Sequence, residues 1–320
     1  MKILMADKFQ EQYLDDLKAL GLDYDLLPDL TADDLPGKIA GYDALIVRST
    51  KVTAATIEAS DKLKIIIRAG AGYNTIDVAK ATEAGIHVCN TPGKNAVAVA
   101  ELAFGLMMAI DRRIPDNVIE LRAGKWNKKT YSKADGLFGK NVLVMGLGEI
   151  GFNFGTRACA FGMNVNGYDV MHSPELQSKL DAAGITFVKD LDEALKNADV
   201  ISLHIPAIPA TKGMINADFL SKVKNNTIIL NTSRGEIVND EDLLAAIESK
   251  KLRVGLDVYN NEPGTAQADF SNALTQHPSV YGTHHIGAST TQAQNAIAAE
   301  VVEIFRNFTQ GKVLHAVNKA

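Results

Sequence analysis

Residues Val142-Leu-Val-Met-Gly-Leu-Gly-Glu-Ile-Gly151 join four apolar side chains to three glycines in the spacing G-x-G-x-x-G. The apolar run predicts a buried strand, and the sequence that follows, as far as Phe161, is typical of a helix. A second short strand is expected at residues 164–168, and Asp169 follows it directly. A strand, a glycine turn, a helix and a second strand that ends in an acid form the context that a dinucleotide-binding fingerprint requires.

Each residue type in this fingerprint has a physical function. Gly146 permits the tight turn after the strand, Gly148 lets a pyrophosphate approach the backbone, and Gly151 lets the helix pack closely on the sheet. The free N–H groups at the helix N-terminus favour an anion. Asp169 is expected to accept hydrogen bonds from both hydroxyls of an adenosine ribose. Because residues 170–172 include no Arg or Lys, a ribose 2′-phosphate would have no counter-charge, and the pattern predicts NAD rather than NADP.

The composition is that of a globular protein of about two domains. The chain has 320 residues, of which 46% are hydrophobic and 22% charged, and its formal net charge is −5. The sequence contains no cluster of basic residues, so we expect no nucleic-acid partner. Cys89 and Cys159 lack metal-ligand spacing, so we expect no metal site. The N-terminal apolar run is too short for a signal peptide and residues 96–110 are too few to span a bilayer, so we expect no membrane association and a cytoplasmic location.

The first 90 residues alternate short strands with helices. Strands are expected at residues 2–6, 24–27, 44–47, 63–67 and 87–89. This alternation predicts a parallel sheet with helical crossovers. Arg48 and Arg68 follow two of these strands, and ligands of such sheets bind beyond the carboxyl ends of the strands. The two arginines therefore either face a common crevice or are solvated loop residues.

The rest of the chain indicates a second domain inserted into the first. A very apolar helix is expected at Val97–Ile110, either bridging two domains or packed in a subunit interface. Six strands are expected after residue 140, enough for a second doubly wound sheet. The amphipathic helix Thr291–Phe308 is expected to return to the first domain. We therefore predict a substrate-binding domain at residues 1–92 and 289–320 and a cofactor-binding domain at residues 93–288.

Three chemically suited side chains, Arg234, Glu262 and His285, follow strands in the second half. An imidazole near a nicotinamide can take the proton of a substrate hydroxyl. A neighbouring carboxylate fixes the ring tautomer and favours the charged form, and a guanidinium can hold a substrate carboxylate. Together they make up a site for oxidising a 2-hydroxy acid. Singly, each has a structural alternative, because lone histidines are often structural and an acid before Pro263 also suits a turn.

Several motifs resemble the D-isomer-specific 2-hydroxyacid dehydrogenases over nearly the whole chain. In the second half they are Asn231-Thr-Ser-Arg-Gly235, Gly255-Leu-Asp-Val-Tyr-Asn-Asn-Glu-Pro263 and Thr283-His-His-Ile-Gly-Ala-Ser-Thr290. Earlier in the chain they are Val47-Arg-Ser-Thr-Lys-Val-Thr53, Arg68-Ala-Gly-Ala-Gly72, Cys89-Asn-Thr-Pro92 and Gly124-Lys-Trp126. The resemblance implies an α/β fold of two doubly wound parallel-sheet domains, with a Rossmann NAD-binding domain inserted into a flavodoxin-like substrate domain.

The resemblance also implies roles for individual residues. His285 is expected to be the acid/base, supported by Glu262, and Arg234 to bind the substrate. The implied cofactor contacts are Ala71, Gly148, Glu149, Ile150, Asp169, Ile205, Thr232, Ser233, Arg234, Asp257, His285, Gly287 and Ala288, with Asp257 on the nicotinamide amide. The implied substrate contacts are Arg48, Ser49, Gly70, Ala71, Asn74, Arg234 and His285.

Two positions depart from the family pattern. His284 stands where proline is usual, so two imidazoles are adjacent, and Lys128 stands where some relatives use an arginine near the substrate phosphate. Because the chain ends at Ala320, the resemblance implies a short form without a C-terminal regulatory domain.

The expected reaction is the NAD-dependent oxidation of 3-phospho-D-glycerate to 3-phosphooxypyruvate, the first step of serine biosynthesis. Positive charge at Arg48, Arg68 and Lys128-Lys129 favours this phosphorylated acid over glyoxylate or hydroxypyruvate, which are the alternative substrates. An NAD-sensing, corepressor-like interaction protein is an alternative of another class, but a sensor has no need of Arg234, Glu262 and His285 together. A homodimer that pairs through the region of Val97–Ile110 is expected.

Overall fold

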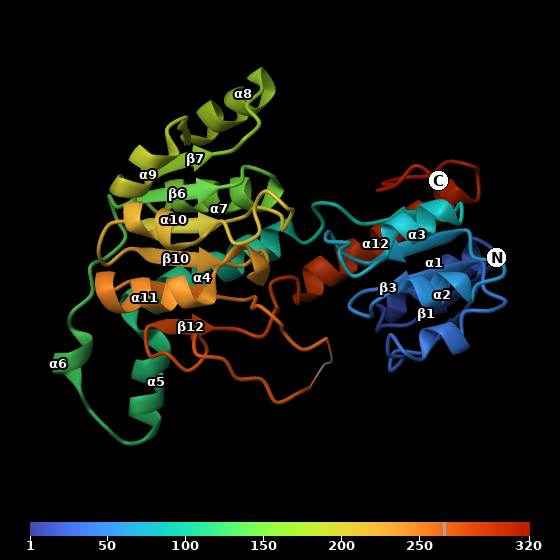
Figure 1. The fold of residues 1–320 in the computed structure, drawn as a ribbon, viewed down its shortest axis with the longest axis horizontal. Coiled ribbons are helices and arrows are strands. Elements are labelled where there is room, and N and C mark those ends of the chain that lie inside the picture. Colours follow the sequence, from blue (N-terminus) through green and yellow to red (C-terminus); the bar gives the residue numbers. More distant parts are fainter. Residues whose placement is uncertain (265–266) are drawn as a thin grey trace. The chain divides into compact units, whose positions relative to one another are not determined.

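The computed structural model describes residues 1–264 and 267–320. They form two compact units, of which unit 1 comprises residues 1–95 and 288–320 and unit 2 comprises residues 96–287. Both chain termini belong to unit 1 (Figure 1). Unit 2 is therefore an insertion in unit 1, and each unit has a sheet of its own.

Unit 1 is built on a five-stranded parallel sheet. Its strands are β1 Lys2–Met5, β2 Asp23–Leu26, β3 Ala44–Val47, β4 Ile65–Arg68 and β5 His87–Cys89. They are arranged in the order β2-β1-β3-β4-β5, with every pair parallel. This is the flavodoxin-like order, which confirms the predicted architecture of the first domain.

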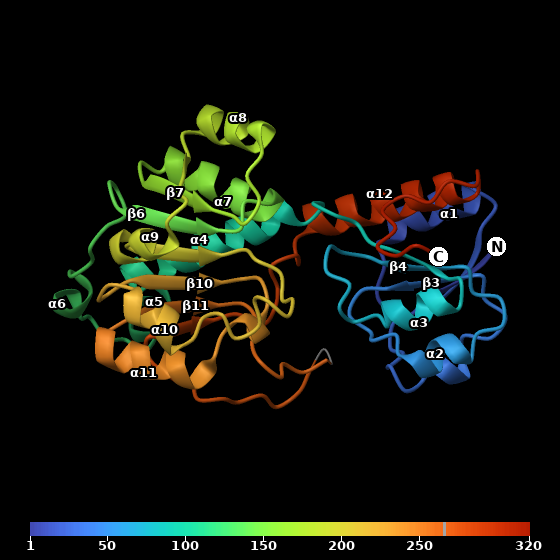
Figure 2. The ribbon, with the colours of Figure 1, turned by 45° about the horizontal axis from the view of Figure 1, so that its top comes forward.

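Helices cover both faces of this sheet. They are η1 Glu11–Tyr13, α1 Leu14–Ala19, η2 Leu35–Gly37, α2 Ala54–Glu58, α3 Val78–Glu83 and α12 Thr291–Phe308. Figure 2 shows α1 and α12 on one face and α2 and α3 on the other. The apolar side of α12, with Ile297, Val301 and Phe305, packs on Ile3 and Ile46 of the sheet. The last helix of the chain thereby completes the core that the first strand begins.

Unit 2 is built on a seven-stranded parallel sheet. Its strands are β6 Asn141–Met145, β7 Asn164–Tyr168, β8 Thr186–Phe187, β9 Val200–Leu203, β10 Ile228–Asn231, β11 Arg253–Leu256 and β12 Val280–Gly282. Their order is β12-β11-β10-β9-β6-β7-β8. The first six in sequence follow the Rossmann order, with the switch point between β6 and β9. The predicted count of six strands after residue 140 was one too few, since the sheet has seven, and β12 extends the Rossmann order beyond β11.

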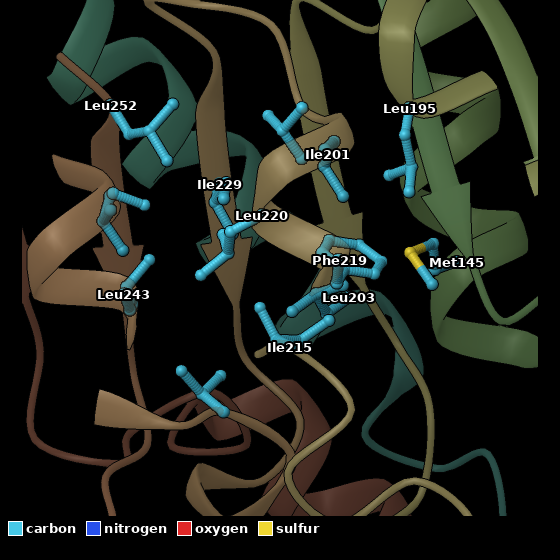
Figure 3. Packing of buried hydrophobic residues seen from close by; sticks show 14 of the residues in the cluster. Met145, Leu195, Ile201, Leu203, Ile215, Phe219, Leu220, Ile229, Leu243 and Leu252 are labelled. Carbon is cyan, nitrogen blue, oxygen red and sulfur yellow. The ribbon is translucent and has the colours of Figure 1, made fainter. Parts of the chain in front are cut away.

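The helices of unit 2 again form two layers. They are α4 Ala96–Arg112, α5 Ile114–Arg122, α6 Lys128–Tyr131, α7 Glu149–Ala160, α8 Pro174–Ala183, α9 Leu191–Asn197, α10 Ala217–Lys222, η3 Gly235–Ile237 and α11 Asp240–Lys250. One face of the sheet carries α4 and α7, and the other carries α9, α10 and α11. In Figure 3, Phe219 and Leu220 of α10 lie against strand residues such as Ile201, Leu203 and Ile229. This packing fixes the strand ends that carry the candidate site.

Helix α4 has a buried side and an exposed side. Ala103, Leu106 and Met107 are buried within unit 2, whereas Val97 and Glu101 on other faces are exposed. The helix therefore covers the sheet of its own unit. Among the described residues no helix is both long enough and apolar enough to cross a membrane.

Candidate functional site

The glycine loop after β6 has the conformation that a dinucleotide fingerprint requires. Gly146 has a φ of +91°, and a Cβ there would lie 2.5 Å from the carbonyl oxygen of His204. A Cβ on Gly151 would lie 1.9 Å from the carbonyl oxygen of Gly146, so this glycine lets α7 approach the strand. At Gly148 a Cβ would meet no atom within 4 Å. The space over Gly148 is therefore open, as an approaching pyrophosphate needs.

The N-terminus of α7 and Asp169 frame this open space. Gly148 is the N-cap of the helix and supplies no side-chain cap, so the first N–H groups can bind an anion. Asp169 accepts hydrogen bonds from the Leu147 N–H (2.7 Å) and the Met171 N–H (3.0 Å). The sequence indicated a ribose contact for Asp169 but not this second role, in which its carboxylate holds the glycine loop against the end of β7.

We expect alanine at Gly151 to lower stability and alanine at Gly148 to weaken NAD binding. Gly151→Ala places a methyl group against backbone atoms, which cannot move aside, and should lower the free energy of unfolding by about 1–3 kcal/mol. Gly148→Ala should leave stability nearly unchanged because the space is open and φ is −66°. It should instead weaken NAD binding roughly tenfold, equivalent to about 1.4 kcal/mol. Denaturant unfolding and calorimetric NAD titration of both variants test this contrast.

Asn231, at the end of β10, builds the loop that carries Arg234. Its Oδ1 accepts hydrogen bonds from the N–H (3.0 Å) and the hydroxyl (2.8 Å) of Ser233, and its Nδ2 donates to the Arg234 carbonyl (2.8 Å). The Arg234 guanidinium donates to the Ser233 carbonyl at 2.6 Å. Thr232 Oγ1 is buried and has no hydrogen-bond partner among the described residues. A buried hydroxyl in that state is suited to a polar ligand group.

Gly235 brings this loop beside the loop that carries Glu262. A Cβ on Gly235 would lie 2.1 Å from the carbonyl carbon of Tyr259. The two backbones are therefore in close contact, which only glycine permits. The Tyr259 N–H in turn donates to Glu262 Oε2 at 3.2 Å. The close approach places Arg234 and Glu262 near one another, although 28 residues separate them in the sequence.

His285 and Glu262 form a direct pair. His285 Nδ1 lies 2.5 Å from Glu262 Oε1, and the backbone of His285 has the unusual φ of +50°. Burial alone would raise the pKa of Glu262, but the hydrogen bond and charge of His285, the Tyr259 N–H and the nearby Arg234 outweigh it, so that this pKa lies below its ordinary value. The adjacent His284 is exposed, and no hydrogen bond joins it to the described residues.

Asp257 orders the loop that presents His285. It is buried, and its carboxylate accepts hydrogen bonds from the Thr283 hydroxyl (2.7 Å) and from the N–H groups of Ile286 and Gly287 (both 2.8 Å). Its carbonyl accepts the His285 N–H at 2.8 Å. Four hydrogen bonds therefore define the backbone around the histidine. The predicted contact between Asp257 and the nicotinamide amide stays a prediction beside this structural role.

The other predicted cofactor residues of unit 2 lie at the carboxyl edge of the same sheet. Glu149 and Ile150 begin α7, Ile205 follows β9, and Gly287 lies in the loop after β12 as the last residue of unit 2. In a parallel sheet these strand ends meet at one edge. Unit 2 therefore brings its predicted cofactor and catalytic residues to one edge of one sheet, whereas Ala288 and Ala71 belong to unit 1.

Unit 1 presents the predicted substrate residues at the ends of the neighbouring strands β3 and β4. Asp7 Oδ2 accepts the N–H groups of Arg48 (2.7 Å), Ser49 (3.1 Å) and Thr50 (3.1 Å), which fixes this turn. Burial lowers the pKa of Arg48, and the charge of Asp7 opposes that effect, so the arginine keeps its charge. Gly70, Ala71 and Asn74 lie in the segment after β4.

A cavity of about 700 Å³ opens at the opposite, amino edge of the sheet of unit 2. Most of its charges are neutralised in place, since Lys224 pairs with Asp199 at 2.8 Å and Arg253 with Asp135 at 3.0 Å. It contains none of the predicted site residues. The candidate site is therefore defined by the strand ends at the carboxyl edge.

Comparison with known families supports the same division of the chain. Residues 104–287 match the model of the D-isomer specific 2-hydroxyacid dehydrogenase, NAD binding domain. The chain belongs to this family. Unit 2 contains the matched residues, so the predicted dinucleotide-binding unit is the NAD-binding domain of the family.

Similar proteins extend the match over nearly the whole chain. The D-3-phosphoglycerate dehydrogenase of Methanocaldococcus jannaschii is 39% identical over 319 residues, which are 99% of this chain and 59% of that protein. The hydroxypyruvate reductase of Thermotoga maritima is 44% identical over 276 residues, 86% of this chain and 87% of that one. The chain thus spans about three fifths of the length of the phosphoglycerate dehydrogenases it matches.

Solved structures show the same fold. The TT0316 protein of Thermus thermophilus superposes with a TM-score of 0.88 at 29% identity, covering 99% of this chain and 100% of that one. The NAD⁺-bound 3-phosphoglycerate dehydrogenase of Entamoeba histolytica superposes with a TM-score of 0.81 at 30% identity, covering 100% and 99%. The predicted fold class, two doubly wound parallel-sheet domains, is confirmed.

Proposed function

We propose that the protein is an NAD-dependent dehydrogenase that interconverts 3-phospho-D-glycerate and 3-phosphooxypyruvate, the first step of serine biosynthesis. The observation that carries the proposal is the 2.5 Å contact between His285 Nδ1 and Glu262 Oε1, beside Arg234. An imidazole with its own carboxylate, next to a guanidinium, suits the removal of a hydroxyl proton from an anionic 2-hydroxy acid.

The hydrogen bond to Glu262 decides which ring nitrogen of His285 reacts. A carboxylate only accepts, so Nδ1 carries the proton in the neutral ring and Nε2 keeps a free lone pair. In oxidation Nε2 takes the C2 hydroxyl proton, the C2–H bond gives up a hydride, and a carbonyl forms at C2. Arg234 holds the carboxylate and stabilises charge on the reacting oxygen. In reduction the imidazolium returns the proton.

The residues of unit 2 fit NAD. Gly148 leaves open space, the N-terminus of α7 lacks a side-chain cap, and the buried hydroxyl of Thr232 lacks a partner among the described residues. Gly148, Glu149 and Ile150 would hold the pyrophosphate, Asp169 the adenosine ribose, and Ile205, Thr232, Ser233, Asp257, Gly287 and Ala288 the rest of the cofactor. NAD, when bound, supplies the acceptor for the hydride.

The substrate contacts proposed for unit 1 are Arg48, Ser49, Gly70, Ala71 and Asn74. Arg48 and Arg68 are two cations on neighbouring strands, which suits an acid that carries a phosphate as well as a carboxylate. Lys128 and Lys129 begin the short exposed helix α6 and add positive charge in unit 2.

A second candidate is the reduction of hydroxypyruvate or glyoxylate by the same residues. The observation that favours it is the 44% identity to the Thermotoga maritima hydroxypyruvate reductase, a protein that this chain covers almost to its full length. An NAD-sensing interaction protein is a weaker candidate, because the pairing of His285 with Glu262 serves proton transfer rather than sensing.

Steady-state kinetics with a panel of substrates test the proposal. The four acids are 3-phospho-D-glycerate, D-glycerate, glycolate and D-lactate, assayed with NAD and with NADP. We expect the highest kcat/KM for the phosphorylated acid with NAD. A preference for glycolate or D-glycerate would establish the second candidate, and equal use of the two cofactors would contradict the role given to Asp169.

We further propose a homodimer that pairs through α4 and α5. Helix α5 exposes Ile114, Val118, Ile119 and Leu121, and Trp126 is 81% exposed nearby in the sequence. Burying such a patch against a second copy would remove it from water. Light scattering at micromolar concentration should give twice the monomer mass for the wild type and the monomer mass for Ile119→Glu. A wild type that is monomeric would rule out this assembly.

A further inference from the structure

The C-terminal segment His315–Asn318 lies along the open edge of the sheet of unit 1. Ala316 forms an antiparallel bridge with Cys89 of the edge strand β5, and the Val317 N–H donates to the Val88 carbonyl at 2.8 Å. Asn318 Oδ1 accepts the Val88 N–H at 2.8 Å. A parallel sheet otherwise exposes the polar groups of its edge strand. The segment therefore completes the sheet.

Side chains on both sides hold the segment in place. Asn318 Nδ2 donates to the Ile86 carbonyl (2.9 Å) and to Thr82 Oγ1 (3.0 Å). On the other side, His315 Nε2 lies 2.7 Å from Oε1 of Glu300 on α12, and Lys94 Nζ lies 2.7 Å from the second oxygen of Glu300. His315 has a φ of +54°, so these contacts hold a backbone conformation that is uncommon for histidine.

Hydrogen bonds continue from this segment to the predicted substrate residues. The His315 carbonyl accepts the N–H of Asn90 at 3.3 Å. The buried side chain of Asn90 donates from Nδ2 to the Ala71 carbonyl at 2.6 Å, and the next residue, Thr91, donates its N–H to the Gly70 carbonyl at 3.0 Å. Two consecutive carbonyls of the segment after β4 are thus fixed by the segment after β5.

We propose that Asn90 is a positioning residue that holds the segment Gly70–Asn74 for the substrate, and that His315–Asn318 keeps Asn90 in place. Gly70–Asn74 needs an external support because it lies between β4 and α3 and Gly70 has a φ of +151°. The effect on turnover rests on the proposed function. The effect on the Gly70–Asn74 backbone does not, because it follows from contacts within unit 1 alone.

Two substitutions each remove one set of these hydrogen bonds. Asn90→Asp keeps the shape of the side chain but replaces the amide donor by an acceptor, so the Ala71 carbonyl loses its partner. Asn318→Ala removes three side-chain hydrogen bonds from the C-terminal segment. Asn307→Ala is the matched control, because it removes two side-chain hydrogen bonds to Glu303 on α12 and contacts neither segment.

Amide hydrogen exchange without substrate is the first measurement. We expect Asn90→Asp and Asn318→Ala to speed exchange in peptides that cover residues 68–77, where the amides of Gly70 and Ile76 are hydrogen-bonded. Asn307→Ala should leave those peptides unchanged. If Asn318→Ala speeds exchange only at residues 86–89, the segment merely covers an edge strand and the proposal is wrong.

Kinetics are the second measurement. Asn90→Asp should raise the KM for the hydroxy acid roughly three- to tenfold, the range for one lost hydrogen bond, with a smaller change in NAD affinity. The double variant should show less than the product of the two single effects, because both act through Asn90. An unchanged KM, or independent effects, would overturn the positioning role. If no 2-hydroxy acid is turned over at all, the proposed function is wrong. The exchange measurement then still tests whether Asn90 and His315–Asn318 hold the backbone of Gly70–Asn74.

Discussion

His285→Ala should lower turnover roughly a hundredfold or more, the usual scale for removing a positioned acid or base. The substitution removes Nε2, which takes the hydroxyl proton, and it leaves Glu262 without its partner at 2.5 Å. NAD binding should change much less, because the hydrogen bonds that order the glycine loop, Asp169 and the N-terminus of α7 do not involve this side chain. Steady-state kcat and calorimetric NAD titration on the same preparation separate the two effects.

His284→Ala is the matched control, since it removes an adjacent and exposed imidazole that no hydrogen bond joins to the described residues. We expect it to keep most of the activity. An inactive His284→Ala beside an active His285→Ala would mean that the acid/base has been assigned to the wrong histidine.

The comparison of two histidines shows what the sequence could not decide. His204 and His285 both follow strands of unit 2. His204 is partly exposed as a residue, but its Nδ1 is buried without a partner among the described residues, and burial lowers its pKa to about 3. Its other nitrogen lies 2.8 Å from the Ser202 hydroxyl. A neutral histidine that is hydrogen-bonded to a hydroxyl is structural. His285 instead pairs with the carboxylate of Glu262, a residue that only the fold places beside it.

Features that depend on local sequence could be predicted well. The glycine fingerprint, the apolar strands and the helix Thr291–Phe308 are encoded in residue spacing, and the structure contains each of them. Helices α5 and α8 were missed; each has a proline in its first turn, and charged and polar residues separate its apolar ones.

The supports of the candidate site could not be predicted, because they join residues far apart in the sequence. Asp257 holds the N–H of Gly287, 30 residues later, and Asp169 holds the N–H of Leu147, 22 residues earlier. Gly235 is recognised as a contact residue only when Tyr259 lies against it. The reacting groups can be predicted from residue types in the sequence. The atoms that orient those groups cannot, because they depend on which strands become neighbours.

Glu262→Gln should lower kcat/KM in both reaction directions. The amide can still accept the hydrogen bond from Nδ1 of His285, so the ring keeps its orientation, but the negative charge is lost. The low pKa of Glu262 reflects its pairing with His285 against the opposing effect of burial. During proton transfer His285 acquires positive charge, and the ionised carboxylate beside it stabilises that charge. The neutral amide of glutamine stabilises it less.

The loss is expected in both directions, because oxidation and reduction pass through the same transition state. A hydrogen bond to a charged group contributes about 1.5–3 kcal/mol, so kcat/KM should fall roughly ten- to a hundredfold. Steady-state kinetics of oxidation and of reduction, measured at one pH on one preparation, test this. An unchanged kcat/KM would mean that Glu262 does not stabilise the imidazolium.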